Sequence, residues 1–161
     1  MRVLAAAALA LLLAACASPQ YEQPGATRAD VVARLGAPTL RMPLADGGEQ
    51  LLYSGQPMGL TVYLLSFDAS GRLVRKEQTL TQEQLQAIPT DGRWTADDVR
   101  RRFGPPARID QVASFDGDVW NYRFQGDFGS PRLAHVHIDR AGVVRRVMFT
   151  DEFLRDRMRF R

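Results

Sequence analysis

The stretch TRADVVARLGAP at residues 27–38 is repeated as TADDVRRRFGPP at residues 95–106. Thr, Asp, Val, Gly and Pro occupy the same places in both copies, at an offset of 68 residues. Weaker matches follow: Tyr53 corresponds to Tyr122 at an offset of 69, and FDASG at 67–71 corresponds to IDRAG at 138–142. Self-similarity at a fixed spacing is typical of repeat architectures. The sequence therefore predicts two tandem repeats.

Each copy is predicted to begin with a short helix. Thr27 and Asp30 form a T-x-x-D capping box, in which the hydroxyl binds free backbone N–H groups and the acid lies near the positive helix end. Gly36 favours the end of the helix, and Pro38 prevents its continuation. The second copy carries the same signals at Thr95, Asp98, Gly104 and Pro106.

Strands are predicted after each helix. Runs of β-forming residues occupy 49–54, 60–67 and 73–77 in the first copy, and 118–124, 133–138 and 143–149 in the second. DASG at 68–71 and DRAG at 139–142 have the composition of tight hairpin loops. The segment TQEQLQAI at 81–88 favours a connecting helix that ends at Pro89. The predicted fold class is α+β, with two repeats that each contain a short capped helix and an antiparallel β-meander.

The N-terminus has the pattern of an export signal. Arg2 precedes thirteen apolar residues, too few for a bilayer span of about 20 residues. Leu13-Ala14-Ala15-Cys16 has the form of the bacterial lipobox, which makes Cys16 a lipid attachment site. Because Cys16 is the only cysteine, an intrachain disulfide is excluded. The alternatives are an ordinary export signal with a chance cysteine, or a buried N-terminal helix.

The predicted organisation follows from these signals. Residues 1–15 form the signal peptide, 16–26 the lipidated Cys16 and an extended tether, and 27–80 the first repeat. Residues 81–94 form a connecting helix and linker, 95–149 the second repeat, and 150–161 a basic C-terminal segment.

Composition and charge exclude several classes of protein. The 161 residues are 45% hydrophobic and 24% charged, with both signs present, which argues against disordered, collagen-like and coiled-coil chains. The chain is also too short for a polytopic membrane protein.

Residues 140–161 carry seven arginines against three acids. In an exported protein such a cluster favours anionic lipid, lipopolysaccharide phosphate or an acidic partner over nucleic acid, and the alternative is a solvated C-terminus. The candidate contacts are Arg155, Arg157, Arg159 and Arg161.

Two further groups are candidate binding residues. His135 and His137 share one face of a predicted strand, where they could take part in a binding face. They could also hold a metal, although a stable site needs three or four ligands, so no metal site is predicted. Trp120, Tyr122 and Phe124 form an aromatic stripe on one face of a predicted strand, and Tyr53 has the equivalent place in the first half. Such a stripe either packs as core beneath the helix or contributes to the binding face.

Catalytic motifs are not found. The chain contains no G-x-S-x-G, H-E-x-x-H, P-loop or dinucleotide fingerprint, and acylation would remove Cys16 as a nucleophile. The sequence therefore predicts a non-enzyme without a cofactor.

The chain resembles the SmpA/OmlA family. The features that carry this resemblance are the lipobox, the capped T-x-x-D-V helices ending in G-x-P, the aromatic strand around Trp120 and the closing hairpins. These BamE-like small outer-membrane lipoproteins are accessory subunits of the β-barrel assembly machinery. The tandem form resembles the fold of the β-lactamase inhibitory protein. The resemblance implies an outer-membrane anchor with three acyl chains, since Ala17 replaces the aspartate that retains lipoproteins at the inner membrane. It also implies a periplasm-facing scaffold that binds an envelope protein, with β-barrel assembly components as one such partner.

Two alternative functions are compatible with the sequence. One is an inhibitor or sensor that captures a periplasmic enzyme on its sheet face, and the other is a small hydrolase or metal protein built around His135 and His137.

Overall fold

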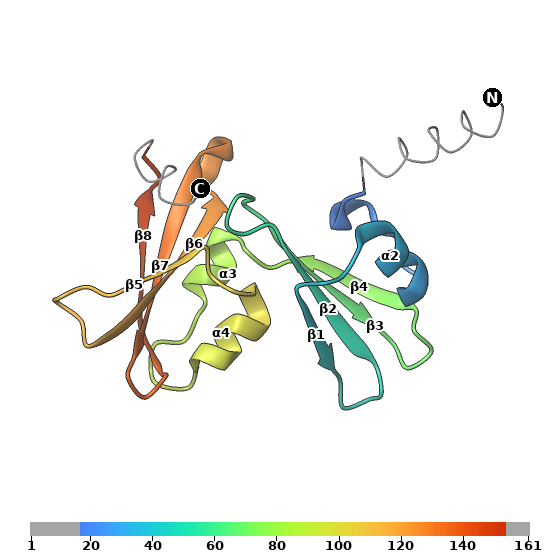
Figure 1. Cartoon of the computed structure of the whole chain (residues 1–161), viewed down its shortest axis with the longest axis horizontal. Helices are drawn as coiled ribbons and strands as arrows, with labels where there is room; N and C mark the ends of the chain where they lie inside the picture. Colours follow the sequence, from blue (N-terminus) through green and yellow to red (C-terminus); the bar gives the residue numbers. More distant parts are fainter. Residues whose placement is uncertain (1–16, 154–161) are drawn as a thin grey trace, which may run out of the picture.

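The computed structural model describes residues 17–153 and has two four-stranded antiparallel sheets with a few short helices (Figure 1). The first sheet contains β1 (Leu40–Pro43), β2 (Glu49–Ser54), β3 (Val62–Phe67) and β4 (Leu73–Gln78). The second contains β5 (Arg108–Asp110), β6 (Gly117–Gln125), β7 (Pro131–Asp139) and β8 (Val144–Asp151). The helical elements are η2 (Pro19–Tyr21), α2 (Arg28–Leu35), α3 (Gln82–Gln86), α4 (Ala96–Phe103) and η3 (Asp127–Gly129). In both sheets the strands follow one another in chain order, so the α+β class is confirmed.

The two capped helices form where the capping signals place them. In α2 the Thr27 side chain accepts a hydrogen bond from the Asp30 backbone, and in α4 Thr95 and Asp98 form a reciprocal capping box. The glycines that end them, Gly36 and Gly104, have φ of 80° and 74°, a conformation that favours glycine. The connecting helix α3 is capped by Thr81 and is shorter than predicted.

The six predicted strands are present with small shifts of their ends, but β1 and β5 were not predicted. Both are edge strands of four and three residues, too short for a recognisable alternation of apolar and polar residues. The last strand, β8, continues to Asp151, past the predicted boundary at residue 149.

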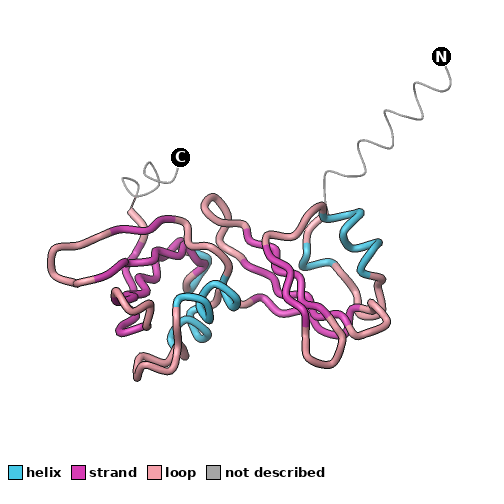
Figure 2. The backbone as a smooth tube through the Cα atoms, turned by 60° about the horizontal axis from the view of Figure 1, so that its bottom comes forward, coloured by secondary structure: helices cyan, strands magenta, loops and turns pink. Residues whose placement is uncertain are grey.

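The first sheet has buried side chains on both faces. On one face Leu51, Tyr53, Leu65 and Phe67 pack with Val31 of α2. The opposite face contributes Leu52, Val62 and Leu64 to a second core, which also holds α4 and the inner face of the second sheet. Figures 1 and 2 show α4 and α3 between the two sheets. The two halves are therefore joined by a shared core.

Two arginines of the second half bind the first half at the rim of this core, one through an ion pair and one through hydrogen bonds to carbonyls. The Arg123 guanidinium of β6 binds both carboxylate oxygens of Glu152, at 2.7 and 3.0 Å, and donates to the carbonyls of Pro57 and Met58 in the β2–β3 loop. Arg102 of α4 binds Glu77 of β4 and thereby lowers the pKa of that carboxyl. Both arginines thus bind groups of the first half from elements of the second.

Residues 17–26, predicted as part of an extended tether, are attached to the first half of the fold. The backbone of Gly25 donates to Leu73 at 2.7 Å, and Glu22 is buried against Arg34. Proline, glycine and polar residues are typical of linkers, but here their backbone groups pair with the start of β4. Among residues 17–153, no helix is both long enough and apolar enough to cross a membrane.

We predict that Gly104→Val destabilises the fold by about 2–4 kcal/mol, because a positive φ is unfavourable for a β-branched residue and a new Cβ would lie 3.0 Å from Leu52 Cδ2. Gly36→Val is the matched control: its φ is similar, but a Cβ there meets nothing within 4 Å, so only the backbone term of about 1–2 kcal/mol applies. Urea denaturation measures the free energy of unfolding of both variants. Equal effects at the two positions would show that the contact of Gly104 with the first sheet is unimportant.

Candidate functional site

The two histidines lie on one face of β7, on the side away from the core. His135 Nδ1 is 2.6 Å from Asn121 Oδ1, and its Nε2 is 2.9 Å from Thr150 Oγ1. His137 is buried against the ring of Phe115, and this burial lowers its pKa. Within residues 17–153 no group of three or more potential metal ligands is found. His135 is therefore held in a cross-strand hydrogen-bond row, and His137 is largely removed from the surface.

The aromatic candidates are interior residues, which corrects the assignment of Tyr53 and Tyr122 to a binding face, whereas Trp120 packs in the core and also lines the hollow described below. Tyr122 is fully buried, and Trp120 and Tyr53 are 5% and 9% exposed. The two tyrosine hydroxyls donate to the carbonyls at the ends of the helices, Tyr122 to Gly104 at 2.8 Å and Tyr53 to Gly36 at 3.1 Å. These side chains face inward because α2 and α4 cover the sheet faces that carry them. Their role in this fold is to connect helix and sheet.

Two sequence predictions concern residues outside the described range. Cys16 lies before Ala17, where the description begins, and Arg155, Arg157, Arg159 and Arg161 follow Phe153.

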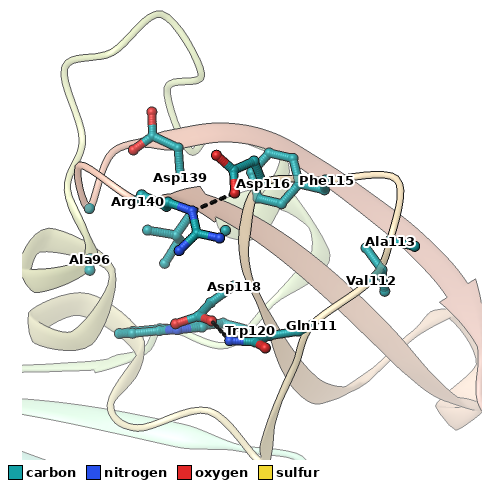
Figure 3. A pocket seen from close by; sticks show the side chains of 13 residues that line it. Ala96, Gln111, Val112, Ala113, Phe115, Asp116, Asp118, Trp120, Asp139 and Arg140 are labelled. Carbon is teal, nitrogen blue, oxygen red and sulfur yellow. Dashed lines mark hydrogen bonds and ion pairs between the residues drawn. The ribbon is translucent and has the colours of Figure 1, made fainter.

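A hollow of about 780 Å³ lies at the open end of the second sheet (Figure 3). It is formed by the β5–β6 loop, the start of β6, the β7–β8 hairpin and the first residue of α4. Its volume is in the range of sites that hold a small molecule or a side-chain cluster of a partner. Its lining combines acidic, basic and apolar groups: Gln111, Val112, Phe115, Asp116, Asp118, Trp120, Ile138, Asp139 and Arg140. We refer to it as the sheet-end hollow.

Three of its charged groups are fixed by contacts within the rim. Asp116 binds Arg140, which raises the pKa of that guanidinium (Figure 3). Asp139 accepts the backbone N–H groups of Ala141 and Val143 at 2.9 and 3.0 Å and binds Arg145. These hydrogen bonds hold the pKa of Asp139 below its usual value. The contacts of Asp139 therefore fix the shape of the β7–β8 hairpin, whereas the Asp116–Arg140 pair that joins it to the β5–β6 loop is exposed to solvent.

Asp118 differs from the other two carboxylates. It accepts one hydrogen bond, from Gln111 Nε2 at 3.3 Å, and forms no ion pair with any residue in the 17–153 range. Because Asp118 and Trp120 are two residues apart on β6, they lie on the same face of the strand. The Arg100 guanidinium lies 5.3 Å from the centroid of the Trp120 ring. The site thus offers a carboxylate that forms no ion pair within residues 17–153, beside the exposed edge of the Trp120 ring, an arrangement that suits a cationic group.

Sequence reasoning identified Trp120 but not the hollow around it. Asp116, Asp118 and the residues of the β5–β6 loop have no periodicity and match no motif. The acidic pair Asp116-Gly117-Asp118 at the start of a strand was the available signal, but Asp139 and Arg140 join it only because β7 pairs with β6.

The comparisons with known proteins give little information. No family model and no curated protein matches the chain. Among solved structures, the chain is similar to a DUF4309 family protein (YjgB) from Bacillus subtilis, with 20% sequence identity, a TM-score of 0.30, and coverage of 79% of each chain.

Proposed function

We propose that this chain is a non-catalytic lipoprotein of the outer membrane that faces the periplasm and binds an envelope protein, as a scaffold or assembly accessory. This is the role that resemblance to the SmpA/OmlA family implies. The observation that carries the binding role is the sheet-end hollow, with its fixed β7–β8 hairpin and the unpaired carboxylate of Asp118.

The proposed tandem duplication is supported by matching contacts in the two halves. Thr27 bridges Arg72 and Thr95 bridges Val143, so each helix start is attached to the last hairpin of its own sheet. The next residues, Arg28 and Ala96, donate to Gly71 and Gly142 at 2.9 and 2.8 Å. The two tyrosine-to-glycine hydrogen bonds described above match in the same way. Matching backbone contacts at equivalent positions of the two halves are expected when one unit has been duplicated.

Attachment to the membrane is proposed from the lipobox around Cys16. Three acyl chains hold a protein far more durably than the marginal binding of one chain, since each buried methylene contributes about 0.8 kcal/mol. The anchored body is then kept at the membrane surface, where envelope proteins are its neighbours.

The proposed binding mode places a basic side chain of the partner in the sheet-end hollow. Its charge would pair with Asp118, and its aliphatic part would pack on Trp120 and Val112, which is 39% exposed. Side chains with an apolar stem and a charged end, such as arginine and lysine, fit this combination.

We predict that Asp118→Lys abolishes partner binding, because it replaces the unpaired carboxylate with a like charge. Asp127→Lys is the matched control, because it makes the same charge change in the exposed loop after β6. The measurement is copurification of envelope proteins with the tagged lipoprotein after mild chemical crosslinking. Unchanged copurification with Asp118→Lys, at wild-type protein levels, would contradict binding at the hollow.

A further inference from the structure

The segment that follows Cys16 is attached to the folded body by an ion pair between a buried carboxylate and a half-exposed guanidinium. Glu22 is 6% exposed and binds Arg34 of α2 through two hydrogen bonds, to Nε at 3.1 Å and to Nη2 at 2.5 Å. Lys76 of β4 donates to the carbonyls of Gln20 and Glu22. The segment is therefore connected by side chains to both a helix and a strand of the first half.

Backbone hydrogen bonds attach the rest of the segment. Gly25 donates to Leu73 at 2.7 Å, and Leu73 donates back to Ala26 at 2.9 Å. Arg72 Nη1 donates to the Gly25 carbonyl at 3.1 Å. These bonds are made at the start of β4, so the segment cannot swing freely about the point where α2 begins.

Little chain remains between Cys16 and this attached segment. The first backbone hydrogen bond of η2 runs from Tyr21 to Ser18, and only Ala17 separates Ser18 from Cys16. Two fully extended residues span about 7 Å. A lipid on Cys16 would therefore bring the surface around η2 within contact distance of the lipid headgroups.

We propose that this surface, formed by Tyr21, Arg34, Arg72 and Lys76, lies against the membrane and fixes the orientation of the body. The proposal rests on the lipidation of Cys16 proposed above. Tyr21 is 66% exposed, and tyrosine is typical of membrane interfaces. The three basic side chains all contact residues 17–26. Glu22 pairs with Arg34, and Asp30 and Asp68 lie close enough to Arg34 and Arg72 to interact with them electrostatically. Arg34 is 49% exposed and can therefore still reach an anionic headgroup.

The orientation has a consequence for binding. Figure 1 shows η2 and α2 at one end of the molecule, and the loop between β5 and β6 at the opposite end. With η2 against the membrane, the sheet-end hollow is turned away from the lipid. A partner can then reach it from the periplasmic side.

The test uses the full lipidated protein in vesicles of phosphatidylethanolamine and phosphatidylglycerol that contain a spin-labelled headgroup quencher. A fluorophore is attached to a new cysteine at Gln20→Cys, within η2, or at Ser114→Cys, in the β5–β6 loop. Both positions are exposed, and the acylated sulfur of Cys16 does not react. A third protein carries Gln20→Cys and an insertion of about ten Gly/Ser residues between Ala17 and Ser18, which frees the body to tumble.

We expect quenching at position 20 to exceed that at position 114 several-fold, and the insertion to remove most of this difference. Equal quenching at both positions of vesicle-bound protein would overturn the fixed orientation but leave the lipid anchor intact. Loss of the protein from the vesicles during flotation would overturn the anchor itself, and the orientation with it. High quenching at position 20 that persists in the insertion variant would still support the contact of the η2 surface with lipid, but would overturn the short connection to Cys16 as its cause.

Discussion

A Cys16→Ser variant is expected to move from the membrane fraction to the soluble periplasmic fraction almost completely. Serine cannot form the thioether that carries the diacylglycerol, so the acyl chains are never added. No other anchor is proposed for the chain, and acyl chains supply most of the membrane affinity of such proteins. The measurement is fractionation of cells that express the variant, followed by detection of the protein in the membrane and soluble fractions.

Ala17→Asp provides the control for this experiment. It leaves Cys16 and its lipid in place, and the resemblance to lipoproteins predicts that it moves the protein from the outer to the inner membrane. Retention of Cys16→Ser in membranes at the wild-type level would refute the lipid anchor, whatever Ala17→Asp does.

Arg123→Ala is predicted to lower the free energy of unfolding by about 3–5 kcal/mol, because it leaves the carboxylate of Glu152 buried without a partner. The two side chains are 8% and 0% exposed, so water cannot replace the missing guanidinium. The same substitution removes the hydrogen bonds to Pro57 and Met58, which connect the two halves.

Arg101→Ala is a suitable comparison for Arg123→Ala. Arg101 pairs with Asp97 on the exposed surface of α4, and such pairs contribute about 0.5 kcal/mol or less. Urea denaturation of the purified proteins, followed by tryptophan fluorescence, measures both changes. Similar small effects for the two variants would contradict the role of Arg123 in holding the halves together.

The helix ends and hairpins could be predicted from the sequence, because they depend on interactions between residues that are close together in the chain. Capping by Thr95 and Asp98, helix ends at Gly36 and Gly104, and the hairpins at Asp68 and Asp139 all depend on residues within a few positions of one another. Short edge strands such as β5 lack this local information, because their pairing depends on a neighbouring strand.

The contacts between distant segments could not be predicted. Glu22 lies in a stretch with the composition of a linker, and only its distance to Arg34 in space shows that the stretch is attached. In the same way, Asp118 becomes part of a site when the β7–β8 hairpin brings Asp139 and Arg140 beside it. The aromatic stripe had two interpretations in the sequence. Burial places Tyr122 and Tyr53 in the core, whereas Trp120 packs in the core and also lines the hollow.

The most direct test of the central claim is photo-crosslinking in living cells from the rim of the sheet-end hollow. A photoreactive residue replaces Val112 at the rim, or Ala69 in the β3–β4 hairpin as an exposed control, in the lipidated protein. Mass spectrometry then identifies the crosslinked proteins. We predict one recurrent envelope protein from position 112 that is absent from position 69 and is lost when Asp118→Lys is added. A β-barrel assembly subunit would indicate the assembly role, and a periplasmic enzyme the inhibitor or sensor role. The same products from both positions, or none from position 112, would contradict a binding site at the hollow.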